Sequence, residues 1–247
     1  MSMETILSQT AVGQQGANKS TIKGRCVISN EYKHEHDEAR ITRDDRDRPN
    51  MPKEDAHLRQ EMKSYLCMRK LSYALAVLNL WYPSAQIDGY DRIVIPCSNS
   101  FGLPYYQARA IDQWAFVRYN SPPATRLDSV VLVWPDETQS RHQACIVEGP
   151  ADALAAAGCG FLGIGVMGNM PPSTVIAFIT GVVKDMNGPV LVLPDADHVE
   201  LGSYIMGSLA VQGVETRIVF PQEHDLAGMK PLDRWRLLCN GTPMHLI

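Results

Sequence analysis

The chain has 247 residues, 45% of them apolar, and carries 23 Lys and Arg against 27 Asp and Glu, a formal net charge of −4 at pH 7. This length and apolar content allow one large domain or two modest ones with a substantial core. The longest apolar runs, 175–183 and 74–82, are too short to cross a bilayer and the N-terminus has no secretory pattern, which together predict a cytoplasmic protein.

Residues 1–56 contain few large apolar side chains and a dense run of mixed charges, which is typical of a flexible polar arm. From residue 57 onward, Leu and Met recur at helical spacing, and Ser72 is placed to cap a second helix. Short β-prone runs divided by turns follow and predict a small antiparallel sheet. We therefore predict an α+β lobe over residues 57–143.

The remaining residues, 144–247, alternate between strand and helix patterns. Such alternation predicts a parallel sheet flanked by helices, and hence an α/β domain. The predicted strands are residues 145–147, 161–167, 190–194 and 215–220, and the helix that follows each is expected near 150–157, 172–184, 199–212 and 231–238.

Acidic residues dominate this last part, which holds five Lys and Arg against ten Asp and Glu. Glu148 directly follows the first predicted strand, Asp195 and Asp197 follow the third, and Asp225 lies just after the fourth. The carboxyl ends of parallel strands meet at one edge of an open sheet, so we expect these side chains to converge there.

Asp152 lies in the first turn of the helix that Pro150 is expected to open, at position N3. An acidic residue there is favourable through the helix dipole alone, by about 0.3–1 kcal/mol, so its position has a purely structural explanation too. The tight Gly149–Pro150 turn also places Asp152 beside Glu148 at the edge of the sheet.

Convergent carboxylates require a cation. Two unit charges about 4 Å apart repel by roughly 4 kcal/mol at an effective dielectric near 20, and more charges add to that cost. Oxygen ligands suit Mg²⁺ or Mn²⁺, which commonly share their coordination with substrate phosphates. The six cysteines form no Cys-x-x-Cys pair, so neither a zinc ribbon nor a redox motif is visible.

Three short motifs in the acidic part carry a family resemblance: EGPAD (148–152), DAD (195–197) and EHDL (223–226). Each follows a predicted parallel strand, and together they resemble the Toprim domain of bacterial-type primases, topoisomerases and certain nucleases. Upstream, SYLCMRKLS (64–72) and VRYNSP (117–122) resemble the helix start and the basic N-terminal lobe of bacterial and phage primase cores. The resemblance covers roughly residues 60–240.

The resemblance implies the catalytic core of a DNA primase, without a zinc ribbon or a helicase domain, that makes short RNA primers on single-stranded DNA by nucleotidyl transfer. It implies Mg²⁺ or Mn²⁺ as cofactor and a Toprim domain over residues 144–247. The implied catalytic residues are Glu148, Asp152, Asp195 and Asp197; the metal ligands are Glu148, Asp195, Asp197 and Asp225; and the nucleotide- and DNA-binding residues are Arg109, Arg118, Asn120 and Lys70.

The partners expected from the resemblance are template DNA, ribonucleoside triphosphates, and a helicase, a single-strand binding protein or a separate zinc-bearing subunit. Two alternatives remain open at this point. A Toprim nuclease would use the same carboxylates with water as the nucleophile. A non-catalytic relative would bind nucleic acid or nucleotide as a replication accessory protein.

Overall fold

A computed structural model describes residues 51–99, 105–122, 129–140, 142–167, 170–221 and 225–241, which all belong to one compact unit spanning 43–247. The predicted arm lies outside the described residues up to residue 50. Its last part, residues 52–55, forms three hydrogen bonds with the strand that begins at Tyr82.

Two helices open the N-terminal lobe: α1 (Arg59–Met68), preceded by the 3-10 turn η3 (Ala56–Leu58), and α2 (Tyr73–Leu78). The predicted cap is confirmed, because Ser72 Oγ accepts a hydrogen bond from the N–H of Leu75 at 3.2 Å. The apolar residues at helical spacing, Met62, Leu66, Leu71 and Leu75, are buried in a core that also contains residues 153–157.

The lobe's sheet is antiparallel, as predicted. Its strands are β1 (Tyr82–Ile87), β2 (Tyr90–Asn99), β3 (Tyr105–Ala110) and β4 (Tyr119–Asn120). Asp88 and Gly89 turn β1 into β2 with φ of 55° and 89°, the positive values that a tight hairpin requires. The fully buried Arg92 pairs with Asp88 at 2.8 Å and donates to the carbonyl of Val117, which fixes the segment leading into β4.

The four strands of the predicted parallel sheet are present as β6 (Ala144–Val147), β7 (Leu162–Gly165), β8 (Val190–Leu193) and β9 (Thr216–Ile218). A further strand, β5 (Ser129–Val133), which was not predicted, joins them. They lie in the order β5-β7-β6-β8-β9, with all neighbours parallel except β5, which runs antiparallel to β7. β5 also pairs with the end of β2, so a single sheet runs through both halves.

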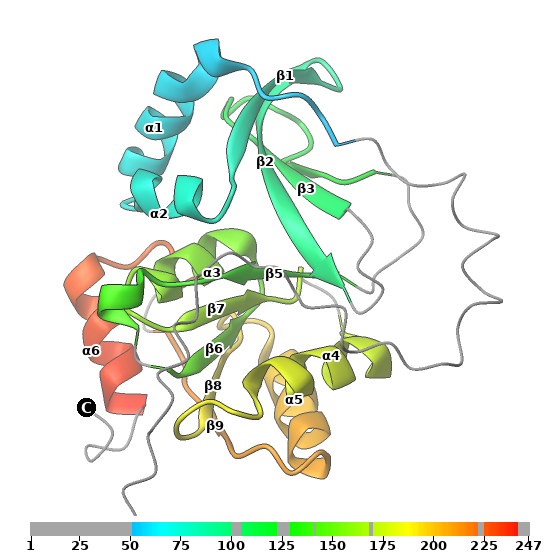
Figure 1. Ribbon diagram of the computed structural model, residues 1–247, viewed down its shortest axis with the longest axis vertical. Coiled ribbons are helices and arrows are strands. Elements are labelled where there is room, and N and C mark those ends of the chain that lie inside the picture. The colour runs from blue at the N-terminus through cyan, green and yellow to red at the C-terminus, as the bar shows by residue number, and fades with distance from the viewer. Residues whose placement is uncertain are drawn as a thin grey trace, which may run out of the picture. The chain divides into compact units, whose positions relative to one another are not determined.

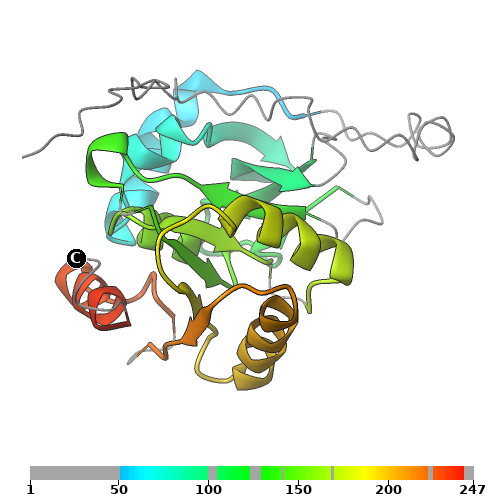
Figure 2. The same ribbon diagram turned by 60° about the horizontal axis from the view of Figure 1, so that its bottom comes forward.

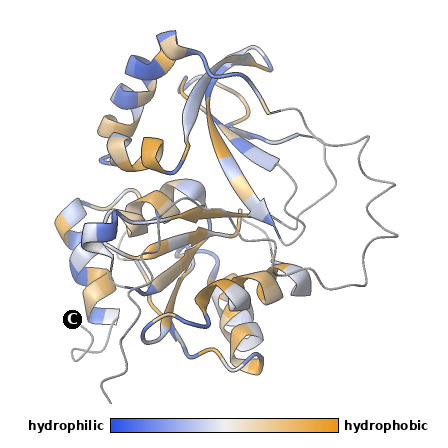
Figure 3. Ribbon diagram, viewed as in Figure 1, coloured by the Kyte–Doolittle hydropathy of each residue, from blue (hydrophilic) through white to orange (hydrophobic). Residues whose placement is uncertain are grey.

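Helices cover both faces of the parallel strands (Figures 1 and 2). They are α3 (Pro150–Ala157), α4 (Ser173–Val183), α5 (Val199–Val211) and α6 (Pro231–Gly241), while the 3-10 turn η4 (Glu137–Gln139) follows β5. α3 and α6 share one core with the N-terminal helices, and α4 and α5 form another on the opposite face. Figure 3 shows β6, β7, β8 and α4 as largely apolar, as expected for strands buried on both faces.

The position of β5 bears on the predicted domain boundary. The division into residues 57–143 and 144–247 stays a proposal, and the structure pairs β5, from the first range, with β7, from the second. No helix in the described ranges has the length and apolar character needed to cross a membrane.

Candidate metal centre

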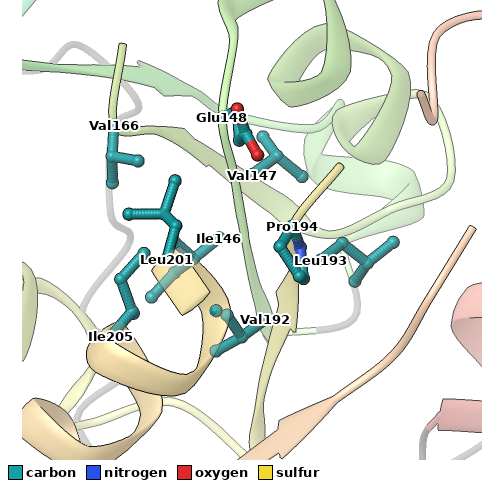
Figure 4. A pocket seen from close by; sticks show the side chains of 10 residues that line it. Ile146, Val147, Glu148, Val166, Val192, Leu193, Pro194, Leu201 and Ile205 are labelled. Atoms are coloured by element: carbon teal, nitrogen blue, oxygen red, sulfur yellow. The ribbon is translucent and has the colours of Figure 1, made fainter. Parts of the chain in front are cut away.

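Glu148 and Asp195 meet at the carboxyl edge of the sheet. Glu148 follows β6 and Asp195 lies two residues beyond β8, and these neighbouring strands are parallel. Glu148 Oε1 accepts a hydrogen bond from the N–H of Asp195 at 2.9 Å. Figure 4 shows Glu148 at the end of β6, above apolar side chains of β6, β8 and α5. The predicted convergence of these two residues is therefore present.

A four-residue turn brings His198 to the same carboxylate. The N–H of His198 donates to the carbonyl of Asp195 at 2.9 Å, which closes the turn Asp-Ala-Asp-His. His198 Nδ1 consequently lies 2.8 Å from Glu148 Oε2 and 3.0 Å from Oε1. Ligand atoms of Glu148, Asp195 and His198 all lie within 4.8 Å of one another. These three residues are a candidate metal-binding group, and we refer to them as the metal centre.

The electrostatics of the metal centre fit a bound cation. Burial, followed by the negative charge of Glu148 and then that of Asp225 and Asp197, raises the pKa of Asp195 to about 6. A carboxylate in this setting is destabilised by its neighbours, and a divalent cation would relieve that repulsion. Asp197 itself is exposed and is not one of the three convergent residues; its role as a ligand stays a prediction.

Asp152 lies beneath the edge and not in the metal centre. It is 7% exposed, and its Oδ1 accepts a hydrogen bond from the N–H of Ala227 at 2.7 Å. Burial, and then the charge of Asp225, raise the pKa of Asp152 to about 7. Pro150 opens α3 as predicted, so Asp152 is at N3, but its carboxylate holds the loop after β9.

The loop between β9 and α6 carries Asp225 of the EHDL motif, and we call it the acidic loop. Asp225 Oδ1 accepts a hydrogen bond from the N–H of Gly228, and Oδ2 lies 3.8 Å from Nη2 of Arg69. The negative charge of Asp225 contributes to the raised pKa of both Asp152 and Asp195. Glu223 of the same motif lies outside the described residues.

Arg234 of α6 fastens this loop to the N-terminal lobe. Its guanidinium is 3% exposed and donates to the carbonyls of Leu226 at 2.8 Å and Ala227 on the loop. It also donates to the carbonyl of Lys70, at 2.9 Å, in the turn between α1 and α2. One buried side chain therefore connects α6, the acidic loop and the first two helices.

The predicted DNA- and nucleotide-binding residues differ in their availability. Arg109 is half-buried: its Nε donates to Tyr65 Oη at 2.8 Å, and its guanidinium lies 4.6 Å from the ring centroid of Tyr119. Asn120 Nδ2 donates to Asp88 Oδ2 at 2.7 Å. The side chains of the other two residues are exposed, Arg118 before β4 and Lys70 near the acidic loop, 3.4 Å from Gly228 O.

No protein-family model and no curated protein sequence matches the chain. Solved structures do. One is the *Aquifex aeolicus* primase, with zinc-binding and RNA polymerase domains, at TM-score 0.56 and 17% identity over 74% of this chain and 56% of that one. Another is the DnaG primase catalytic domain bound to ssDNA, at 0.53 and 14%, over 73% and 70%. A third is the primase fragment of the bacteriophage T7 primase-helicase, at 0.52 and 13%, over 71% and 72%.

Bacterial and phage primase catalytic domains share this fold. The fold class expected from the sequence is thus confirmed, and these identities show the fold alone. The chain spans little more than half of the *Aquifex aeolicus* chain it matches.

Sequence analysis missed two residues that the structure connects to this site. His198 follows the DAD motif directly, and the signal that would have found it is the spacing of a turn, which brings its first and fourth residues together. No sequence pattern could have indicated Arg234. Its four carbonyl partners belong to residues 69–70 and 226–227, two segments that are far apart in the sequence.

Proposed function

We propose that the protein is a DNA primase, which copies single-stranded DNA into short RNA primers by metal-dependent nucleotidyl transfer. The observation that carries the proposal is the convergence of Glu148, Asp195 and His198 at the carboxyl edge of a sheet whose fold is that of primase catalytic domains. In the proposed reaction, a 3′-hydroxyl forms a bond to the α-phosphorus of a nucleoside triphosphate, and pyrophosphate leaves.

Glu148 and Asp195 are the residues proposed to hold Mg²⁺ or Mn²⁺, with Asp197 and Asp225 as further ligands. The bound ion would neutralise charge that develops on the phosphate oxygens. The N–H of Asp195 orients the carboxylate of Glu148, which is proposed to bind the metal or to accept the proton of the attacking hydroxyl.

Asp152 contributes by position. Because its Oδ1 accepts from the N–H of Ala227, it holds the backbone of the loop that also carries Asp225. We therefore propose that Asp152 acts as a positioning residue. Its buried carboxylate fixes the loop that presents Asp225.

The N-terminal lobe is proposed to bind the polyanionic substrates. Arg118 and Lys70 are exposed and able to contact phosphates, and Lys70 is adjacent to the acidic loop. Arg109, held between Tyr65 and Tyr119, would contact phosphate from a fixed position. Asn120 would give up its hydrogen bond to Asp88, or share it, in order to bind substrate. Each of these contacts is a proposal.

The decisive experiment supplies the purified chain with a single-stranded DNA template, ribonucleotides and Mg²⁺ or Mn²⁺, and looks for short RNA products. Since a catalytic metal contributes several kcal/mol, Glu148→Gln should lower product formation by roughly 100-fold or more. Glu215→Gln, an exposed carboxyl just before β9 at the opposite edge of the sheet, is the matched control and should leave synthesis unchanged.

Other products would identify the alternatives. Degradation of the template, abolished by Glu148→Gln, would replace primer synthesis by nuclease activity. Retained DNA binding without either product would make the protein a replication accessory factor. Either result would reject the primase proposal while leaving the fold intact.

Partners belong to the same proposal. Because the acidic part of the sequence holds five Lys and Arg against ten Asp and Glu, we expect template affinity to be modest and to fall steeply with salt concentration. A helicase, a single-strand binding protein or a separate zinc-bearing subunit would then deliver the template. Addition of such a protein should raise primer yield at a salt concentration where the chain alone is inactive.

A further inference from the structure

We propose that His198 is a nitrogen ligand of the metal centre and that it makes the centre prefer Mn²⁺ over Mg²⁺. This inference rests on the proposed metal site and adds to it the chemistry of its selectivity. It begins from the contact between His198 and Glu148, because Nδ1 of the imidazole lies within hydrogen-bond distance of both oxygens of this proposed ligand carboxylate.

The backbone directs His198 into the metal centre. Its N–H donates to the carbonyl of Asp195 and its carbonyl accepts from the N–H of Leu201 at 3.0 Å, so both sides of the residue are fixed. His198 precedes α5, yet its side chain makes no capping hydrogen bond to that helix. The imidazole instead extends to the two oxygens of Glu148.

The resulting donor set is mixed. Glu148 and Asp195 offer oxygen, His198 offers nitrogen, and their ligand atoms lie within one 4.8 Å group. Mg²⁺ binds oxygen almost exclusively and gives up water reluctantly, whereas first-row transition metals accept imidazole nitrogen. Replacing one oxygen ligand by nitrogen should therefore favour Mn²⁺ relative to Mg²⁺ at this centre.

The simpler interpretation is that His198 only pairs with Glu148, since the imidazole is 54% exposed. That role would orient the carboxylate for any divalent ion equally. The two interpretations differ in a measurable way: a ligand discriminates between metals and leaves a nitrogen signal on the ion, and an orienting partner does neither.

The test uses the full chain, freed of divalent ions, with Mn²⁺ or Mg²⁺ added alone. Calorimetric titration measures both affinities, and pulsed electron paramagnetic resonance of bound Mn²⁺ detects a directly coordinated ¹⁴N. We expect a ¹⁴N signal that His198→Gln abolishes. The same substitution should weaken Mn²⁺ binding by roughly 10–100-fold, the loss of metal affinity that substitutions around a metal site typically cause. It should weaken Mg²⁺ binding less, because Gln still supplies an oxygen.

His142→Gln is the matched control, since His142 precedes β6 whereas Glu148 follows it, and it should change neither affinity. A ¹⁴N signal that persists in His198→Gln, or equal losses for both metals, would overturn the inference. In that case primer synthesis by the unmodified chain would still support the proposed function. Failure of the unmodified chain to bind either metal would reject the inference and the proposed metal site together.

Discussion

Asp152 provides a quantitative test of the electrostatics beneath the metal centre. Its carboxyl is 7% exposed, and burial together with Asp225 raises its pKa from 3.8 to about 7. The folded chain therefore holds this proton more tightly than the unfolded chain does. The stability associated with the protonated carboxyl is fully present below pH 4 and is lost progressively as the pH rises to about 7.

The size of the effect follows from the same values. A tenfold change in a protonation equilibrium corresponds to about 1.4 kcal/mol, so a rise from 3.8 to about 7 amounts to at most about 4 kcal/mol. Asp152→Asn removes the ionisation and keeps an oxygen that accepts from the N–H of Ala227. As the pH rises from 4 to 7, the free energy of unfolding of Asp152→Asn should increase relative to that of the unmodified protein by up to about 4 kcal/mol.

The assay is chemical denaturation of both proteins in the presence of a chelator, at intervals from pH 4 to 8. Asp185→Asn, an exposed carboxyl beyond the end of α4, is the control and should show no comparable change. A difference between Asp152→Asn and the unmodified protein that stays constant over this range would refute the reasoning. It would mean that the carboxyl of Asp152 is not held in an environment that opposes its charge.

Three further predictions concern the free energy of unfolding, measured by denaturant titration. Arg234→Met should destabilise the protein by about 3 kcal/mol or more, because it leaves several buried carbonyls without a donor, whereas the exposed Arg236→Met should cost under about 0.5 kcal/mol. Gly163→Ala should cost about 1–3 kcal/mol, since its Cβ would lie 2.0 Å from Ala153 O, while Gly181→Ala in α4 meets open space and should stabilise by about 0.5–1 kcal/mol. Leu80→Gly should stabilise the protein by about 0.5–1 kcal/mol, because Leu80 is 71% exposed and has φ of 63°, a value that favours glycine. A change of the opposite sign in any of these variants would contradict the explanation given for it.

Local pattern was sufficient for most of the secondary structure. The helix predicted at 150–157 is α3, residue for residue, because Gly149 and Pro150 start it and Gly158 follows its alanine-rich run. The helices near α4 and α5 agree within one residue at each end, whereas α6 runs three residues beyond its predicted end. Apolar periodicity is a local property, so it survives without knowledge of neighbours.

Long-range pairing was not accessible in the same way. The local pattern of residues 129–133 carries no information that β5 runs antiparallel to β7 and joins both halves into one sheet. For the same reason, the positions of acidic residues after the strands were predictable, whereas the partners of their side chains were not. Asp152 turned out to bind the N–H of Ala227, 75 residues away.

The sequence by itself determined which strands end in carboxylates, because a strand's carboxyl end and the residue after it are adjacent in the chain. Only the tertiary structure decided that the side chain of His198, and not that of Asp197, joins Asp195 at Glu148. The physical reason is that the backbone geometry of the turn brings its first and fourth residues, Asp195 and His198, together. Because β6 and β8 are neighbouring parallel strands, the turn after β8 then lies beside Glu148 at the end of β6.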